Sequence, residues 1–141
     1  MACRRLPEGS LLPFSIGLRR RRLHLPSTSP HQVPTAQDLL DEASGHVAMG
    51  ELPEAAALYR QATGLEPDNF DAWHSLGMAL MRDGQLQAAL GPALMATDLR
   101  PNDLLAWTAL SQLHVKMGHI AEAETAKANA RILSLGGKIA P

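Results

Sequence analysis

The side chains that could carry chemistry in this chain are six histidines, a few neighbouring carboxylates and one cysteine. A metal or catalytic site needs several of these on one face, and His114 and His119 are five residues apart across Gly118, which does not suit one helical face. No His-Glu-x-x-His, phosphate-loop or nucleophile-elbow pattern occurs. His46 and His114 are expected to be packing residues with a polar tip. We therefore expect a non-enzymatic protein with no cofactor, no metal and no small-molecule substrate.

Cys3 is the only cysteine, so neither an intrachain disulfide nor a cysteine-based zinc site can form. This favours a reducing compartment, and the expected location is cytoplasmic. The longest apolar run, Leu11 to Leu18, is too short to span a bilayer and contains Pro13 and Gly17.

Charge divides the chain into a basic arm and an acidic body. Residues 1–34 hold six arginines and one glutamate, a balance of +5, whereas residues 35–141 hold seven basic and thirteen acidic residues, a balance of −6. The arm contains the run Arg19–Arg22 among proline and serine residues, so a disordered arm is expected for residues 1–34. A mitochondrial transit peptide, a start codon assigned too far upstream, and binding to nucleic acid or an anionic membrane are alternatives, the last being unlikely.

The elements that position the remaining side chains follow from an internal repeat of 34 residues. Equivalent positions in three units hold the same kind of residue: Leu39, Trp73 and Trp107; Gly50, Gly84 and Gly118; Ala55, Ala89 and Ala123; Ala62, Ala96 and Ala130. Pro67 and Pro101 keep the same interval in two units, and Leu135 stands at the third position. The bulky column opens an apolar helical face, and glycine stops that helix because it adopts left-handed angles at little cost. Alanine lets two antiparallel helices approach, and proline sets the turn to the next unit. Each unit is thus predicted to be helix, tight turn, helix, turn.

These columns resemble tetratricopeptide repeats, most clearly in "WHSLGMALMRDGQLQAALGPALMATDLRPN". The resemblance covers residues 35–135 and implies an all-α fold, with antiparallel helix-turn-helix repeats stacked as a short right-handed α-solenoid. The units are expected at about residues 36–69, 70–103 and 104–135, followed by a flexible tail at 136–141.

The chain departs from the repeat pattern in the second unit and at its end. Pro92 falls inside the second helix of the middle unit, which predicts a kink near Ala88–Pro92 or a late start of that helix. Ala93 stands where the first unit has Tyr59, so loose packing is expected there. No capping helix follows the third unit, which leaves self-association or docking on a larger assembly as an alternative function and a weak homo-oligomer possible.

The resemblance also implies a ligand site on the concave surface formed by the first helix of each unit. The expected groove residues are Leu40, Val47, Asp71, His74, Met78, Met81, Arg82, Leu105, Gln112, Val115 and Lys116. Their apolar members predict a protein partner that offers an amphipathic helix or an apolar peptide segment.

One subfamily holds the acidic C-terminal carboxylate of chaperones with lysine, asparagine and arginine. The matching positions here are Leu40, Ser44, Ser75, Leu105 and Ala109. None of these side chains can bind a carboxylate through two charged hydrogen bonds, so that ligand is not expected.

Overall fold

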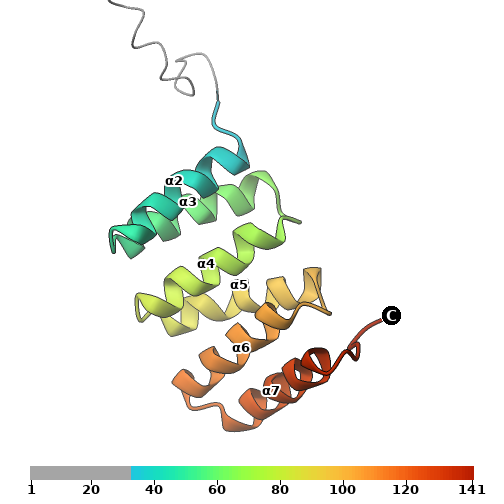
Figure 1. Ribbon diagram of the computed structural model, residues 1–141. Coiled ribbons are helices and arrows are strands. Elements are labelled where there is room, and N and C mark those ends of the chain that lie inside the picture. The colour runs from blue at the N-terminus through green and yellow to red at the C-terminus, as the bar shows by residue number, and fades with distance from the viewer. Residues whose placement is uncertain (1–32) are drawn as a thin grey trace, which may run out of the picture. The chain divides into compact units, whose positions relative to one another are not determined.

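The computed structural model describes residues 33–141, and within this range the secondary structure is entirely helical (Figure 1). The helices are α2 (Ala36–Ala48), α3 (Leu52–Leu65), α4 (Phe70–Arg82), α5 (Leu86–Leu99), α6 (Leu104–Met117) and α7 (Ile120–Ser134). One series starts at residues 36, 70 and 104 and the other at 52, 86 and 120, so both keep the predicted interval of 34. The basic arm, apart from its last two residues, lies outside the described residues.

The helices form three antiparallel pairs stacked in chain order, α2 with α3, α4 with α5 and α6 with α7 (Figure 1). We call α2, α4 and α6 the A helices, and α3, α5 and α7 the B helices. Successive A helices touch one another, and α3 and α5 each pack against their own A helix and the next one. This confirms the all-α, solenoid-like architecture. Within residues 33–141 no helix is both long and apolar enough to cross a membrane.

Side-chain caps start the A helices at one repeated position. The Thr35 hydroxyl accepts a hydrogen bond from the backbone N–H of Asp38 at 3.1 Å, and the Asp38 carboxylate accepts one from the Thr35 N–H at 2.9 Å. The Asn69 side-chain oxygen accepts a hydrogen bond from the Ala72 N–H at the start of α4, and the Asp103 carboxylate accepts hydrogen bonds from the N–H groups of Leu105 and Ala106 at the start of α6. These caps satisfy N–H groups that have no partner inside the helix, so they fix where each A helix begins.

Tight turns join each A helix to its B helix without a side-chain cap. The backbone φ is +80° at Gly50, +85° at Gly84 and +81° at Gly118, the left-handed region that glycine enters most easily. The N–H of His119, just after Gly118, donates to the carbonyl of His114 at 2.8 Å, which closes the last turn of α6.

The core consists mainly of alanine and leucine. Leu76, Leu80 and Leu113 are its largest fully enclosed side chains. The repeated tryptophans lie at its edge, half-buried, and the indole N–H of Trp107 donates to the Pro101 carbonyl at 2.7 Å. Trp73 makes the same bond to Pro67 at 2.6 Å, so each tryptophan also ties its helix to the preceding turn.

Helix α5 runs without interruption through Pro92 and begins at Leu86, in register with α3 and α7. The expected late start of this helix is therefore wrong: the Gly84 turn sets its first residue, as in the other units. Gly77 of α4 faces the stretch of α5 around Pro92, where an added Cβ would lie 3.4 Å from the backbone nitrogen of Ala93. The missing side chain at Gly77 allows this close approach of α4 and α5.

The tail at 136–141 is tied to the loop between α5 and α6. The side-chain oxygen of Asn102 accepts hydrogen bonds from the N–H groups of Ile139 at 2.8 Å and Ala140 at 3.1 Å. The Asn102 amide nitrogen donates to the Ala140 carbonyl at 2.9 Å. One side chain thus holds the tail by three hydrogen bonds.

Candidate functional site

The predicted groove residues all lie on A helices, but they differ in how much surface they offer. Six are exposed: Asp71, Arg82, Leu105, Gln112, Val115 and Lys116. Three are half-buried: Val47, His74 and Met78. Two belong to the core, since Leu40 is 8% exposed and Met81 is 6% exposed. A ligand on this face would therefore meet mainly α4 and α6.

Met81 and Val115 show why equivalent positions differ in exposure. Both stand at the same point of their units, one on α4 and one on α6. Met81 is enclosed because α6 packs beside α4, whereas no A helix follows α6 and Val115 stays 58% exposed. Leu105, near the start of α6, is 63% exposed. The most accessible large apolar side chains of the predicted groove are thus on α6.

A small cavity of about 10 Å³ lies between α4, α5 and α6. Its lining comprises His74, Gly77, Met78, Met81, Ala93, Ala96, Ala106, Ala109 and Leu113. Three of the predicted groove residues, all on α4, therefore meet around one apolar space, which has room for roughly one water molecule. The cavity borders Ala93, the residue around which loose packing was predicted.

The cavity arises from an exchange of large and small side chains between repeats. In the first unit Ser44 on α2 faces Tyr59 on α3, with their oxygens 3.5 Å apart. The equivalent positions in the second unit are Met78 and Ala93, which line the cavity together. A flexible side chain on the A helix thus takes the place of a rigid ring on the B helix.

His74 stands at the edge of this cavity in a stack of side chains. Its ring is parallel to that of Phe70, with centroids 5.4 Å apart, and the Arg100 guanidinium carbon lies 4.4 Å from the Phe70 ring centre. Burial lowers the pKa of His74 below its usual value, although the negative charges of Asp103 and Asp71 oppose that effect. Its imidazole is therefore held mainly neutral near pH 7.

The stack at His74 is the part of the site that the groove prediction missed. Phe70 lies four residues before His74 on one helix, a spacing from which their contact could have been foreseen. Arg100 and Asp103 come from the loop between α5 and α6, and their nitrogen and oxygen are 4.0 Å apart. No local pattern in the sequence connects this loop to α4.

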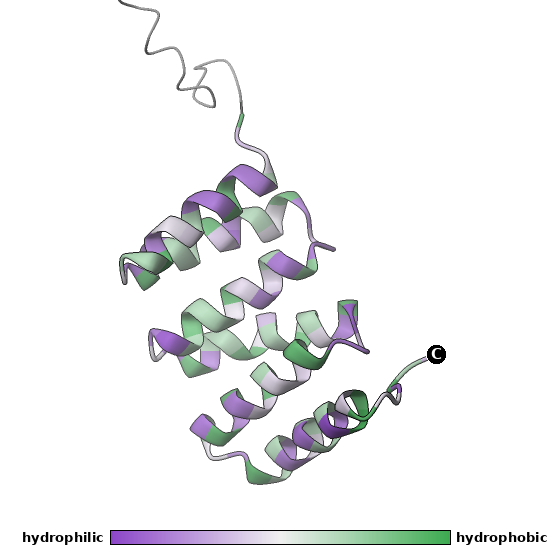
Figure 2. Ribbon diagram, in the orientation of Figure 1, coloured by the Kyte–Doolittle hydropathy of each residue, from purple (hydrophilic) through white to green (hydrophobic). Residues whose placement is uncertain are grey.

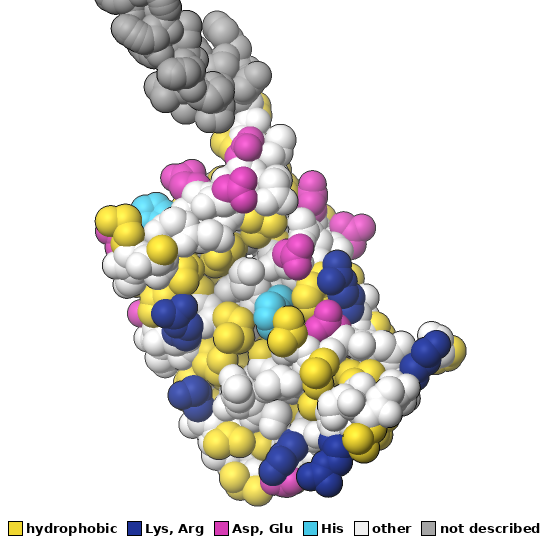
Figure 3. Space-filling view, in the orientation of Figure 1, with side chains coloured by type: hydrophobic (Ala, Val, Ile, Leu, Met, Phe, Trp, Pro, Cys, Tyr) yellow, Lys and Arg dark blue, Asp and Glu magenta, His cyan; other side chains and the backbone are white. Residues whose placement is uncertain are grey.

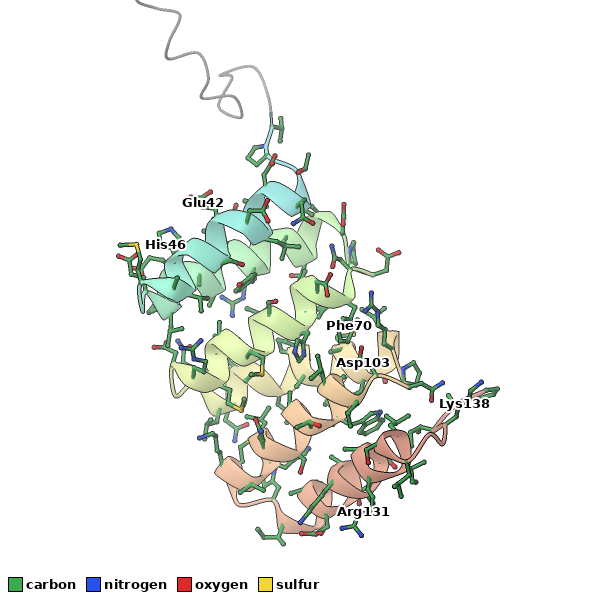
Figure 4. The ribbon with its side chains drawn as sticks, viewed as in Figure 1. Glu42, His46, Phe70, Asp103, Arg131 and Lys138 are labelled. Carbon is green, nitrogen blue, oxygen red and sulfur yellow. The ribbon has the colours of Figure 1, made fainter. Side chains whose placement is uncertain are left out.

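Charged side chains border the apolar part of this face (Figure 3). A histidine lies among hydrophobic side chains there, with acidic groups and a neighbouring basic side chain toward one edge and basic groups toward the other. Asp71 and Asp103 belong to the N-terminal ends of α4 and α6, where Figure 4 labels Phe70 and Asp103, whereas Arg82 and Lys116 belong to the C-terminal ends. The two edges follow the ends of the helices because the A helices run parallel to one another.

Comparison with known proteins identifies the repeat. A sequence model of the tetratricopeptide repeat matches residues 40–103. Residues 40–103 are built of tetratricopeptide repeats. No curated protein sequence matches it.

Solved structures of other proteins, two of them named as tetratricopeptide-repeat domains, share this fold. The second repeat domain of Spaghetti (RPAP3), bound to the HSP90 peptide SRMEEVD, superimposes with a TM-score of 0.67 at 17% identity, over 70% of this chain and 92% of that one. The Sgt2 domain of Aspergillus fumigatus gives 0.68 at 25% identity, over 75% and 70%. The Yersinia enterocolitica translocator chaperone SycD gives 0.69 at 17%, over 77% and 82%.

The last tetratricopeptide repeat ends the stack with a charged surface. On α3 the positions Ala56, Tyr59 and Thr63 are buried, 3%, 5% and 6% exposed, where α3 packs against the following A helix. The equivalent residues of α7 are Glu124, Lys127 and Arg131, all exposed. Hydrophilic residues recur along α7, and Arg131 points away from the stack (Figures 2 and 4). The outer face of α7 is therefore polar where a further repeat would need an apolar one.

Histidines meet at the turn of the third repeat. The Nδ1 atoms of His114 and His119 are 3.3 Å apart, because the turn at Gly118 brings together residues that one helix would separate. At the same position of the first repeat, His46 Nδ1 lies 2.7 Å from a Glu51 carboxylate oxygen. Within residues 33–141 no group of three or more His, Cys, Asp or Glu side chains is arranged to hold a metal ion.

Proposed function

We propose that this chain is a non-enzymatic interaction scaffold that binds an apolar peptide or an amphipathic helix of another protein on the A-helix face. The observation that carries the proposal is the exposure of Leu105 and Val115 on α6, the helix that packs beside α4 with its half-buried Met78 and His74. Large apolar side chains grouped on one face and bordered by charges are typical of protein-binding surfaces.

The ligand differs in this proposal from an acidic chaperone tail. The positions that would hold a terminal carboxylate carry Leu40, Ser44, Ser75, Leu105 and Ala109, none of which is basic. Leu40 and Ala109 are also buried. The binding energy is expected to come from apolar contacts rather than from charged hydrogen bonds.

The polar end of α7 does not favour the alternative of docking through the last repeat. Packing a second copy there would bury Glu124, Lys127 and Arg131, and charges lose hydration when they are buried. Binding through the arginine-rich arm stays a prediction, because the arm lies outside the described residues. The cytoplasmic location also stays a prediction.

Cross-linking capture from the native host tests the groove with two double variants of the full chain. Leu105→Glu/Val115→Glu places charges on the A-helix face, at side chains exposed enough to leave the core intact. Leu65→Glu/Leu94→Glu places the same charges on B helices, at side chains 53% and 43% exposed. We expect the first variant to lose the partners of the wild type and the second to keep them, with circular dichroism showing both folded. Equal capture by both would contradict binding at the groove.

A further inference from the structure

We propose that the cavity behind Met78 is an anchor pocket that takes one large apolar side chain of the partner segment, with a basic residue beside it in that segment. This inference rests on the proposed function, because it assigns the ligand chemistry of the same groove. It concerns the second repeat alone, since the other two repeats fill the corresponding space differently.

Five of the nine residues that line the pocket are small, and the others are His74, Met78, Met81 and Leu113. Gly77 on α4, Ala93 and Ala96 on α5, and Ala106 and Ala109 on α6 contribute no side chain longer than a methyl group. The present cavity of about 10 Å³ is smaller than a leucine side chain, so Met78 has to move when the pocket is occupied. Met78 is half-buried and unbranched, and methionine changes rotamer at little cost.

The first repeat shows what a closed version of this space looks like. Tyr59 occupies the B-helix position, is 5% exposed and has its hydroxyl 3.5 Å from Ser44. Because the Tyr59 ring is buried and its hydroxyl lies beside Ser44, a ligand would displace it less readily than it would displace a methionine. The third repeat has Gln112 and Lys127 at these positions, and both side chains are exposed.

Polar groups at the pocket specify the rest of the ligand. The half-buried imidazole of His74 lines the pocket, and we expect its N–H to donate to a carbonyl of the bound peptide. The carboxylates of Asp103 and Asp71 are near enough to act on His74 electrostatically. Asp71 is exposed, and a lysine or arginine of the ligand would meet negative charge there. The expected ligand therefore has leucine, methionine or phenylalanine next to a basic residue.

A phage-displayed library of random dodecapeptides, selected on the full-length chain, tests this specificity. We expect the enriched peptides to share one large apolar position with lysine or arginine adjacent. Replacing that apolar residue by alanine in the best synthetic peptide should weaken binding at least about tenfold. Enrichment without an apolar position, or an unchanged affinity of the alanine peptide, would overturn the proposal.

A transplant between repeats tests the pocket itself. Met78→Ser/Ala93→Tyr gives the second repeat the pair found in the first, and should close the pocket and weaken the selected peptide at least about tenfold. The reciprocal change, Ser44→Met/Tyr59→Ala, is the matched control and should leave affinity unchanged. If circular dichroism shows that the transplant does not fold, the proposal is tested instead by the affinity of the alanine-substituted peptide for the wild-type chain.

Failure of the pocket and failure of the groove give different results. Peptides that lose binding to Leu105→Glu/Val115→Glu but bind the folded transplant as tightly as wild type would overturn the anchor pocket and keep the groove. Peptides indifferent to both variants would overturn both proposals. Loss of binding in both variants, with the reciprocal control unaffected, would support both.

Discussion

Single residues in this chain take their roles from their place in the repeat more than from their chemical type. Gly118 and Gly45 are both exposed, and a Cβ added at either position would have no atom within 4 Å. They differ in backbone alone, since Gly118 has φ +81° at the end of α6 while Gly45 lies inside α2. A methyl group added at each position therefore separates backbone strain from packing.

Replacing these two glycines by alanine is predicted to change stability in opposite directions. Gly118→Ala should lower the free energy of unfolding by about 1–2 kcal/mol, because alanine is strained in the left-handed region. Gly45→Ala should raise it by about 0.5–1 kcal/mol, since alanine favours a helix interior. Urea denaturation followed by circular dichroism measures both. A stabilising Gly118→Ala would mean that the turn does not depend on left-handed backbone angles.

The site was harder to predict than the repeat because exposure depends on neighbours. The sequence indicated which residues lie on A helices, and all eleven do. It did not show that Met81 is covered by α6 while Val115, its equivalent, has no helix beside it. The stack of Arg100 on Phe70 was also beyond prediction, because it joins the first residue of α4 to the residue that follows α5, the two ends of the second repeat.

At the scale of helices, side-chain caps and glycine turns set the helix boundaries, and a proline inside α5 does not change them. Both helix series keep the 34-residue interval because caps at Thr35, Asn69 and Asp103 and glycine turns recur in register. These signals are local, so the sequence predicted the helices well. Pro92 removes the donor that would bond to the Ala88 carbonyl, yet α5 continues around it, because packing of α5 between α4 and α6 outweighs the local cost.

Replacing Pro92 by alanine is predicted to stabilise the fold. Alanine regains helix propensity of about 3 kcal/mol, and loss of two buried ring carbons offsets about 1.6 kcal/mol, leaving a net gain of about 1 kcal/mol. Pro53→Ala is the matched control: Pro53 lies in the first turn of α3, where proline is tolerated, so a change within about 0.5 kcal/mol is expected. Thermal and urea unfolding of both variants check this. A destabilised Pro92→Ala would show that packing of the buried ring is worth more than the missing hydrogen bond.

At the scale of the whole molecule, the stack has two different kinds of surface. The A-helix face carries exposed apolar side chains, whereas the outer face of α7 carries Glu124, Lys127 and Arg131 where earlier repeats bury uncharged side chains. The sequence left self-association through the third repeat as an alternative, because no capping helix follows that repeat. The charges on the outer face of α7 oppose this alternative, since a stacked helix would have to remove them from water.

Restoring the inner-repeat residues on α7 is predicted to make that end associate. In the full chain, Glu124→Ala/Lys127→Tyr/Arg131→Thr recreates the face that α3 presents to α4, and two copies can then bury it against each other. Size-exclusion chromatography with light scattering should give a monomer for the wild type and a concentration-dependent dimer for the variant. Arg60→Tyr/Gln61→Ala, which adds a tyrosine to exposed positions of α3, controls for apolar surface in general and should stay monomeric. If the wild type is a dimer and the triple variant dimerises equally, self-association occurs elsewhere on the molecule. If the triple variant is a monomer, these three charges are not what prevents dimerisation through α7.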